Sequence, residues 1–418
     1  MGKPVVIVGA GLSGLSCART LHAQGIPVRV LERGRAVGGR VQTDEVDGFR
    51  LDRGFQILLT GYPALAQHLD LDALDLRAFE PGAVLWTGQR FETIGDPLRA
   101  PASMLPTLFA RSGTLRDKIE VLRLRRDVLR GDDYAAFSSD DRTTLEYLQS
   151  RGFSERFIEQ FFRPFLGGVF LEPNLETTAR FFRFVFRMFS SGEAAIPARG
   201  MGSIPLQLAA GLPAGSVSVE TAVAEVRSNG VRLEDGPWLE ASAVVVATEA
   251  TSAARLVRGI EVPPWRAVSC FYFAADRAPS TRKALHLDAS SGGPINNLHV
   301  ASAISPEVAP PNKHLISVTC LGGTNDPERL RDAVLAQAET WFGAQVRAWT
   351  PVRDYVIGEA LPAQPVGALE PPRRPVRHRS GVYVCGDYVD QASIDGAMAS
   401  GRRAAEAIAA DQSREATG

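Results

Sequence analysis

The first forty residues constrain the fold of this chain more than any other segment. A short β-branched run at residues 4–8 leads directly into Gly9-Ala10-Gly11-Leu12-Ser13-Gly14. Apolar residues then recur at helical spacing until Gly25, and a second strand is predicted at residues 28–31, which ends at Glu32. This order predicts a dinucleotide-binding βαβ unit of an α/β fold, because it combines a strand, a glycine turn, a helix, a second strand and an acid.

Each glycine of the turn has a separate physical role. Gly9 permits a tight turn, Gly11 lets backbone N–H groups approach a pyrophosphate, and Gly14 lets the helix pack closely on the strand. Leu12 and Ser13 open the helix, whose free N–H groups and positive dipole end attract phosphate. The turn therefore predicts a pyrophosphate site, with a purely structural turn as the alternative.

The acid and the loop after it narrow the choice of dinucleotide. Glu32, followed by Arg33, comes 18 residues after Gly14, close to the roughly 20 expected of an acid that binds a ribose diol. A carboxylate at this position would repel a 2′-phosphate, which disfavours NADP. Shortly afterwards, Gly38-Gly39-Arg40 suits a loop lying across phosphates, with Arg40 supplying the charge.

The C-terminal end carries a second pattern. Residues 381–385 form an apolar run that ends at Gly386-Asp387, and residues 393–401 open a helix predicted to reach about residue 410. Taken alone, the Gly-Asp step is equally compatible with an ordinary turn at a strand end. Its combination with the N-terminal turn makes a coincidence improbable.

Together these motifs resemble the superfamily of FAD-dependent amine oxidases, phytoene desaturases and protoporphyrinogen oxidases. The resemblance implies a Rossmann-like FAD-binding domain of the glutathione-reductase type, interleaved with an α+β substrate domain. It implies that Asp387 holds the ribityl or pyrophosphate region, and that the N–H of Ile394 lies near the N1–C2=O edge of the flavin. It also implies that the backbone of Gly54, Phe55 and Gln56 lies against the flavin ring, and that the backbone of Val223 reads the adenine.

The same resemblance divides the chain. We expect the FAD-binding domain to comprise residues 1–75, 197–264 and 372–418, with a helix at residues 204–210 and strands near 216–220, 223–227, 230–234 and 243–247. The substrate domain is then formed by residues 76–196 and 265–371.

The chain departs at three positions from the amine-oxidising members of the superfamily that it resembles, and these departures affect the expected reaction. Ser269 stands where they carry a lysine near flavin N5, although the alignment could slip by one residue. Ser393 stands where they place an aromatic residue of the amine-steering cage. No cysteine lies near residues 360–365, where some members attach FAD covalently. These departures weaken the amine-oxidase hypothesis and predict non-covalent FAD.

The intervening segments suggest an apolar substrate. Eleven phenylalanines lie between Phe153 and Phe189, and they could pack the core or line an apolar tunnel to the flavin. His299 lies in a polar cluster, but a lone histidine is more often structural than catalytic. No catalytic residue is assigned, because a bound flavin itself supplies the hydride-accepting step.

A basic segment raises the question of lipid contact. Residues 111–130 have a net charge of +4, with Leu115, Ile119, Leu122 and Leu129 on a rough helical stripe. Such a cationic helix could lie on anionic lipid. The favoured interpretation is a solvated helix with its other face on the core.

Composition limits the remaining classes of protein. Forty-six basic and 47 acidic residues exclude a generally basic nucleic-acid coat. The four cysteines lie far apart and form no CxxC, and no metal-ligand pattern occurs. The cysteine spacing favours a reducing, cytoplasmic location. No apolar run approaches the roughly 18 residues that a membrane span needs, and peripheral contact with a membrane is left open.

The leading hypothesis is therefore an FAD-dependent oxidoreductase that accepts hydride at flavin N5 from a small apolar substrate, polyene- or porphyrinogen-like. The electron acceptor is left open between oxygen and a quinone. The alternatives are a flavin-dependent isomerase of the same fold, an amine oxidase, and a non-enzymatic prenyl-binding protein resembling GDP dissociation inhibitors.

Overall fold

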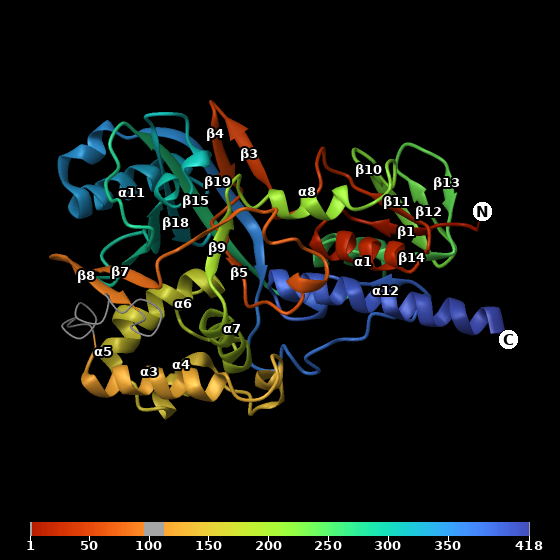
Figure 1. Cartoon of the computed structure of the whole chain (residues 1–418), viewed down its shortest axis with the longest axis horizontal. Helices are drawn as coiled ribbons and strands as arrows, with labels where there is room; N and C mark the ends of the chain where they lie inside the picture. The colour runs from red at the N-terminus through yellow and green to blue at the C-terminus, as the bar shows by residue number, and fades with distance from the viewer. Residues whose placement is uncertain (1, 96–112, 418) are drawn as a thin grey trace.

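The computed structural model describes residues 2–95 and 113–417. Figure 1 shows two main bodies of structure joined by strands that cross between them. One body contains both ends of the chain, and the other contains a large mixed sheet with a group of helices below it. None of the helices in the described ranges combines the length and apolarity needed to cross a bilayer.

A five-stranded parallel sheet forms the centre of the first body. Its strand order is β10 (Val217–Ser218), β2 (Val28–Leu31), β1 (Val5–Val8), β14 (Ala243–Val246) and β20 (Tyr383–Val384). β1 and β14 are buried throughout, as expected of central parallel strands that are covered on both faces. The register aligns Val8 with Leu31 on one side and with Val246 on the other, so strands from three distant segments end at the same edge.

Two helices from opposite ends of the chain pack on this sheet. α1 (Leu12–Ala23) follows the glycine turn and α12 (Ile394–Thr417) is the C-terminal helix. They cross so closely that a Cβ on Gly401 would lie 2.1 Å from the carbonyl oxygen of Ser13. α12 continues past the predicted end near residue 410, and no Gly or Pro stops it before Thr417.

Smaller elements complete this body. The predicted segments form α8 (Ser203–Ala210), β11 (Val223–Arg227) and β12 (Gly230–Leu233), and a strand that was not predicted, β13 (Trp238–Glu240), extends them into an antiparallel meander. Other short elements here are η1 (Leu65–Gln67), α9 (Ala250–Leu256) and η7 (Asp387–Val389). The hairpin of β3 (Thr43–Val46) and β4 (Phe49–Asp52) packs instead on the sheet of the second body, and β5 (Leu58–Leu59) lies between the two bodies.

A seven-stranded mixed sheet forms the second body. Its order is β19 (Thr350–Pro362), β15 (Trp265–Ala275), β18 (His314–Leu321), β17 (Asn297–Val300), β16 (Leu285–Asp288), β7 (Gly82–Trp86) and β8 (Phe91–Gly95). α11 (Pro327–Phe342) lies on this sheet with η6 (Gly343–Ala348), and α10 (Ala301–Ile304) with η5 (Pro306–Val308) links β17 to β18. All its strands belong to the segments assigned to the substrate domain.

A helical layer lies below this sheet in Figure 1. It comprises α3 (Leu115–Val128), η3 (Ala135–Ser138), α4 (Thr144–Ser150), α5 (Glu155–Phe157), the π-turn η4 (Ile158–Phe162), α6 (Arg163–Phe170) and α7 (Ala179–Ser191). β9 (Ala194–Pro197) leads back from α7 and pairs with β5 and with β6 (Leu76–Ala78).

The orientation of α3 differs from the one that the apolar stripe suggested. α3 does place one face on the core, but the buried residues are Asp117, Glu120, Leu124 and Val128. The predicted stripe of Leu115, Ile119, Leu122 and Leu129 is exposed. Hydrophobic periodicity located the helix correctly, whereas buried polar contacts determine which face packs inward.

Candidate functional site

One cavity of about 1520 Å³ extends from the parallel sheet into the helical layer. Its wall contains every candidate cofactor-binding residue from the sequence except Gly14: Gly9, Gly11, Leu12, Ser13, Glu32, Arg33, Gly39, Arg40, Gly54, Phe55, Gln56, Val223, Gly386, Asp387 and Ile394. The opening glycine turn and the closing Gly-Asp step therefore share one site.

Gly14 lies behind the wall, where it has the packing role expected of the third glycine. A Cβ at this position would lie 2.0 Å from the carbonyl oxygen of Gly9 and 3.2 Å from the Cβ of Ala247. Gly9 itself has φ +105°, a backbone conformation that favours glycine. The two glycines thus set the turn, and the turn holds α1 against the sheet.

The start of α1 is suited to a phosphate group. Its N-cap, Gly11, provides no side-chain hydrogen bond, so the first-turn N–H groups are donors for an anion. A Cβ on Gly11 would meet no atom within 4 Å, so it would project into the cavity. Leu12 and Ser13 line the same wall. The geometry fits the pyrophosphate of a dinucleotide.

Glu32 lies at the end of β2, beside this turn. Its Oε2 accepts a hydrogen bond from the N–H of Ala10 (2.8 Å) and its Oε1 accepts one from the N–H of Gly34 (2.7 Å). The carboxylate is thereby fixed on the cavity wall with lone pairs left over for a ribose diol. Val223 reaches the same cavity from β11, consistent with an adenosine end here.

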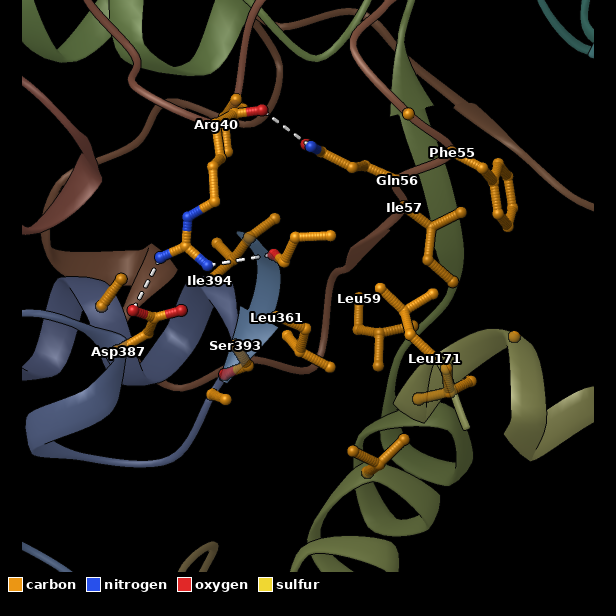
Figure 2. A pocket seen from close by; sticks show the side chains of 18 of the residues that line it. Arg40, Phe55, Gln56, Ile57, Leu59, Leu171, Leu361, Asp387, Ser393 and Ile394 are labelled. Atoms are coloured by element: carbon orange, nitrogen blue, oxygen red, sulfur yellow. Dashed lines mark hydrogen bonds and ion pairs between the residues drawn. The ribbon is translucent and has the colours of Figure 1, made fainter. Parts of the chain in front are cut away.

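An ion pair joins the two ends of the chain on the wall. Arg40 Nη2 lies 2.7 Å from Asp387 Oδ1, and Arg40 Nη1 donates to the carbonyl oxygen of Ala360 at 3.0 Å (Figure 2). Gln56 Nε2 in turn donates to the carbonyl oxygen of Arg40 at 2.9 Å. In the structure, Arg40, which was expected to face phosphates, positions Asp387.

A buried carboxylate that sequence reasoning missed anchors the start of α12. Asp395 accepts hydrogen bonds from the backbone N–H of Ala64 (2.8 Å), the hydroxyl of Tyr134 (3.0 Å) and Nε2 of Gln391 (2.8 Å). Burial raises the pKa of Asp395. These contacts come from three separate segments, so they fix the position of Ile394 at the cavity wall.

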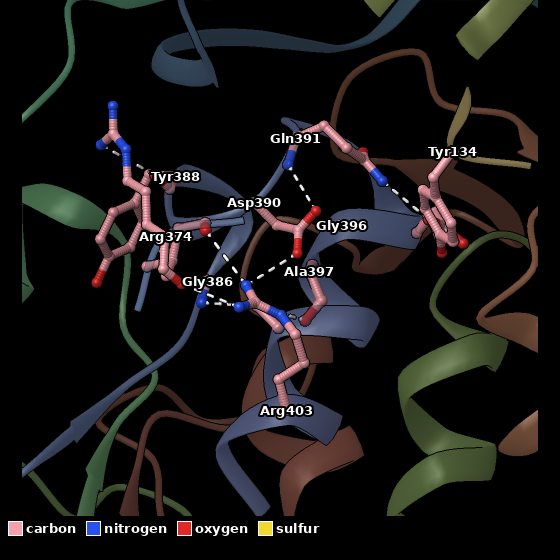
Figure 3. A network of polar contacts seen from close by, with 12 residues as sticks. Tyr134, Arg374, Gly386, Tyr388, Asp390, Gln391, Gly396, Ala397 and Arg403 are labelled. Atoms are coloured by element: carbon pink, nitrogen blue, oxygen red, sulfur yellow. Dashed lines mark hydrogen bonds and ion pairs between the residues drawn. The ribbon is translucent and has the colours of Figure 1, made fainter. Parts of the chain in front are cut away.

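The loop before α12 is tied down in the same region, as Figure 3 shows. Arg403 on α12 forms an ion pair with Asp390 at 2.9 Å and donates to the carbonyl oxygens of Arg374 (2.9 Å) and Val389 (3.3 Å). The backbone N–H of Gly386 donates to the hydroxyl of Ser400 at 3.0 Å. The Gly-Asp step is therefore held from the helix side.

Asp52 supports the turn that carries Gly54 to the wall. Its carboxyl group accepts hydrogen bonds from the hydroxyl of Thr43 (2.5 Å) and the backbone N–H of Met201 (2.9 Å). Burial raises the pKa of Asp52 to about 6. Gly54 follows with φ +83°, so this carboxyl group stabilises the backbone on which Gly54 and Phe55 are placed.

This raised pKa predicts a pH-dependent stability. A folded-state pKa above the unfolded value gives stability that is present at low pH and lost as the pH rises through about 6. From about pH 5 to about pH 8 the contribution of Asp52 should fall by roughly 1–2 kcal/mol. The side chain of the variant Asp52→Asn cannot ionise. The melting temperature of the variant minus that of wild type should therefore increase as the pH is raised from about 5 to about 8. A constant difference in melting temperature would contradict this role.

The other end of the cavity is apolar and aromatic. Six of the eleven phenylalanines line it: Phe157, Phe161, Phe165, Phe181, Phe186 and Phe189. The other five are buried in the core. Phe165 stacks on Phe161 with ring centroids 5.6 Å apart and contacts Phe189 at 5.3 Å. Some of the phenylalanines therefore pack the core and others line the cavity, so each of the two interpretations holds for part of the cluster.

Aliphatic residues from β5, from the end of α6 and from the large sheet complete the apolar wall and were not recognised in the sequence. Figure 2 shows Leu59, Leu171 and Leu361 around the space next to Ile394. Val268 on β15 and Ile357 on β19 also line the cavity, and the strand register pairs them.

The structure places Ser269, the residue compared with a lysine near flavin N5, away from the cavity. Ser269 does not line the cavity: it is fully buried and donates from its hydroxyl to the carbonyl oxygen of Gly322 at 3.0 Å. Its neighbour Val268 faces the cavity instead. Ser393 does line the cavity, and its hydroxyl bonds to Gln391 within the loop.

His299 has a structural environment. Its ring packs against Phe55 (centroids 4.8 Å apart) and Phe79 (5.9 Å), and it is not among the residues of the cavity wall. Burial lowers its pKa to about 3, so the ring is neutral at ordinary pH. None of the four cysteines, all of which lie in the described ranges, lines the cavity.

The chain is similar to known proteins over parts of its length. The chain is 25% identical over 167 residues to protoporphyrinogen oxidase 2 of Arabidopsis thaliana, covering 40% of this chain and 32% of that protein. It is 33% identical over 92 residues to a phytoene desaturase of Fusarium fujikuroi, covering 21% of this chain and 16% of that protein. These alignments thus span a third or less of each relative's length.

The fold is shared more widely. A crystal structure of an oxidoreductase from Methanosarcina mazei superposes with a TM-score of 0.76 at 18% identity, covering 96% of this chain and all of that one. The family model for flavin-containing amine oxidoreductases matches residues 12–409, nearly the whole chain. The protein therefore belongs to the flavin-containing amine oxidoreductase family.

Proposed function

We propose that this protein is an FAD-dependent oxidoreductase that oxidises a small apolar substrate of the polyene or porphyrinogen kind. A single observation carries the proposal: one continuous cavity connects the candidate dinucleotide-binding residues to a chamber of phenylalanine and aliphatic side chains. A flavin held at one end would meet a substrate held at the other.

The polar end contains the groups that would hold FAD. The N-terminus of α1 beside Gly11 would bind the pyrophosphate, Glu32 the adenosine ribose, and Asp387 the ribityl or pyrophosphate region. The N-terminus of α12 at Ile394 would face the flavin ring, where its positive dipole end favours negative charge. A bound flavin would accept a hydride from a substrate C–H bond, which is the difficult step of such an oxidation.

The apolar end is suited to orient a substrate and exclude water. Phe161, Phe165 and Phe189 form a contiguous aromatic surface in the chamber, and such surfaces bind apolar molecules without requiring charge complementarity. Two of the relatives described above are named for phytoene and for protoporphyrinogen, which supports this substrate class.

The positions of the four cysteines support non-covalent binding of FAD. The cysteines at positions 17, 270, 320 and 385 are buried away from the cavity, so no thiol is placed to attach the cofactor. We expect denaturation in acid to release all of the flavin into the supernatant.

Two enzymatic alternatives have specific counter-arguments or tests. An amine oxidase is disfavoured because no lysine stands where the resembling amine-oxidising proteins carry one. Ser269 was compared with that lysine, and its neighbour Val268, an apolar residue, faces the cavity. An isomerase would act on its substrate in the reduced state without consuming an electron acceptor. The prenyl-binding alternative is disfavoured by the intact glycine turn and by the family match.

Anaerobic reduction tests the proposal. FAD-loaded protein is mixed with a polyene or a porphyrinogen in detergent micelles, and the flavin absorption band is followed. We expect bleaching by the apolar substrates, no bleaching by primary amines, and reoxidation by oxygen or a quinone. Bleaching by amines alone would contradict the proposal, and conversion by photoreduced protein without an acceptor would identify the isomerase instead.

The variant Glu32→Ala tests the ribose end separately. Loss of hydrogen bonds to a charged acceptor should weaken FAD binding by about 1–3 kcal/mol. The substitution also removes the bonds to Ala10 and Gly34, so part of the loss will come from a looser turn. Fluorescence titration of apoprotein with FAD measures the change. An unchanged affinity would remove Glu32 from the site.

A further inference from the structure

The exposed face of α3 carries apolar side chains, the reverse of a typical surface helix. Leu115 is 66% exposed, Ile119 43% and Leu122 48%. Each residue of an α-helix advances by about 100°, so these three positions lie within about 60° of one another. Leu124 and Val128, with two acidic residues, occupy the opposite, buried face. In Figure 1, α3 lies along the outer edge of the helical layer.

Buried polar contacts hold the helix in this orientation. Asp117 accepts hydrogen bonds from the backbone N–H and the hydroxyl of Ser154, both at 2.7 Å, and forms a capping box with Thr114. Glu120 lies 2.6 Å from Arg151 in an ion pair. Rolling the helix to bury its apolar stripe would break these contacts and leave charges unpaired. The outward direction of the stripe is therefore a fixed feature of the fold.

Basic side chains flank the stripe. By the same advance of about 100° per residue, Arg116 and Arg123 lie on one side of it, where Arg123 also pairs with Glu120 at 3.4 Å. Lys118 and Arg125 lie on the other side, where both also belong to the cavity wall. Arg126 lies beside the stripe itself, where a long arginine stem can extend along an apolar surface towards polar headgroups. An apolar stripe between two basic rows is the arrangement of helices that lie in the interface of an anionic bilayer.

The same residues border the cavity. Leu115, Ile119 and Leu122 are exposed and also belong to the cavity wall, as do Phe157 and Phe161. Residues that are both exposed and on the wall mark an opening. The cavity therefore continues from the exposed face of α3 to the aromatic chamber, along a wall that is mainly apolar and that includes Lys118 and Arg125 near α3.

We propose that α3 docks on the surface of an anionic phospholipid bilayer, so that an apolar substrate enters the cavity directly from the lipid. This inference rests on the proposed function, because only an apolar substrate would benefit from such an entrance. The charge of the basic rows favours phospholipid over a second copy of this chain, which would bring like charges together.

Vesicle flotation with the FAD-loaded protein tests the docking. Vesicles of phosphatidylcholine alone are compared with equimolar phosphatidylcholine and phosphatidylglycerol, at low and high salt. We expect binding to the anionic vesicles that weakens with salt. The double variant Ile119→Ser, Leu122→Ser removes two inserted side chains and should reduce partitioning by about tenfold or more.

A matched control comes from a distant exposed leucine. Leu206 on α8 is 62% exposed, and Figure 1 shows α8 well above α3, outside the helical layer. The variant Leu206→Ser should therefore bind vesicles like wild type. An equal loss in this variant, or no binding of wild-type protein to anionic vesicles, would overturn the proposal. Self-association that the α3 double variant abolishes, without vesicle binding, would assign the face to a second copy.

The outcomes separate the docking from the proposed function. Failure to bind vesicles, with the flavin still bleached by micellar substrate, would refute the docking and leave the function intact. Vesicle binding without any bleaching by apolar substrates would refute the function and remove the reason for substrate entry at α3.

Discussion

The variant Gly11→Val should fold normally and yet purify without FAD. A Cβ at this position meets no protein atom within 4 Å, so the valine side chain has room in the apoprotein. That room is the part of the cavity in which we place the pyrophosphate, and the added side chain would exclude it. A rigid overlap that costs more than about 3 kcal/mol would weaken FAD binding by more than about 100-fold.

The matched control for this variant is Gly14→Val. A Cβ on Gly14 would lie 2.0 Å from the carbonyl oxygen of Gly9, so this substitution should disrupt the packing of α1 and lower the yield of folded protein. Circular dichroism and the ratio of flavin to protein absorbance distinguish the two effects. Folded Gly11→Val protein that purified yellow at full occupancy would refute the placement of the glycine turn.

The variant Phe165→Asp should lose activity towards an apolar substrate while retaining FAD. Phe165 lies in the aromatic part of the cavity wall, between Phe161 and Phe189. A carboxylate there would be desolvated without a partner whenever an apolar molecule occupied the chamber. A penalty above about 3 kcal/mol would lower kcat/KM by more than about 100-fold.

The control for this second variant is Phe165→Leu, which keeps the wall apolar. Its kcat/KM should remain within about tenfold of wild type, since only packing changes. Both variants should bind FAD like wild type, because Phe165 lies among the helical-layer residues and not beside the glycine turn. Wild-type kcat/KM in Phe165→Asp, or a gain in activity towards a cationic amine, would contradict the apolar-substrate hypothesis.

Much of the nucleotide end could be predicted from the sequence because its physical requirements are local. Glycine is required where the backbone turns with φ +105° at Gly9 and where α1 approaches the turn at Gly14. Helical and strand periodicity then located α1, β2 and β14 within a few residues. The meeting of the two chain ends followed from the resemblance, because no local rule specifies which distant segments share a site.

The features that the sequence did not reveal depend on long-range packing. The apolar wall on β15 and β19 depends on strand register, and a shift of one residue places Ser269 inside the sheet and Val268 on the cavity. Asp395 has no local signature, because its partners Ala64 and Tyr134 come from remote segments.

The orientation of α3 shows a related limit of periodicity. A stripe of Leu and Ile predicts that a helix has an apolar face, but not that this face is turned inward. In α3 the buried partners of Asp117 and Glu120 outweigh the apolar stripe, because unpaired buried charges cost more than exposed leucines.

The central claim is that both ends of the chain hold one FAD molecule, and a crystal structure of the FAD-loaded protein tests it most directly. We predict continuous density for a single FAD, with its ribose at Glu32, its pyrophosphate at Gly11 and its ring between Gly54 and Ile394. FAD density elsewhere in the molecule, or a cofactor that contacts the glycine turn without reaching Asp387, would contradict the account.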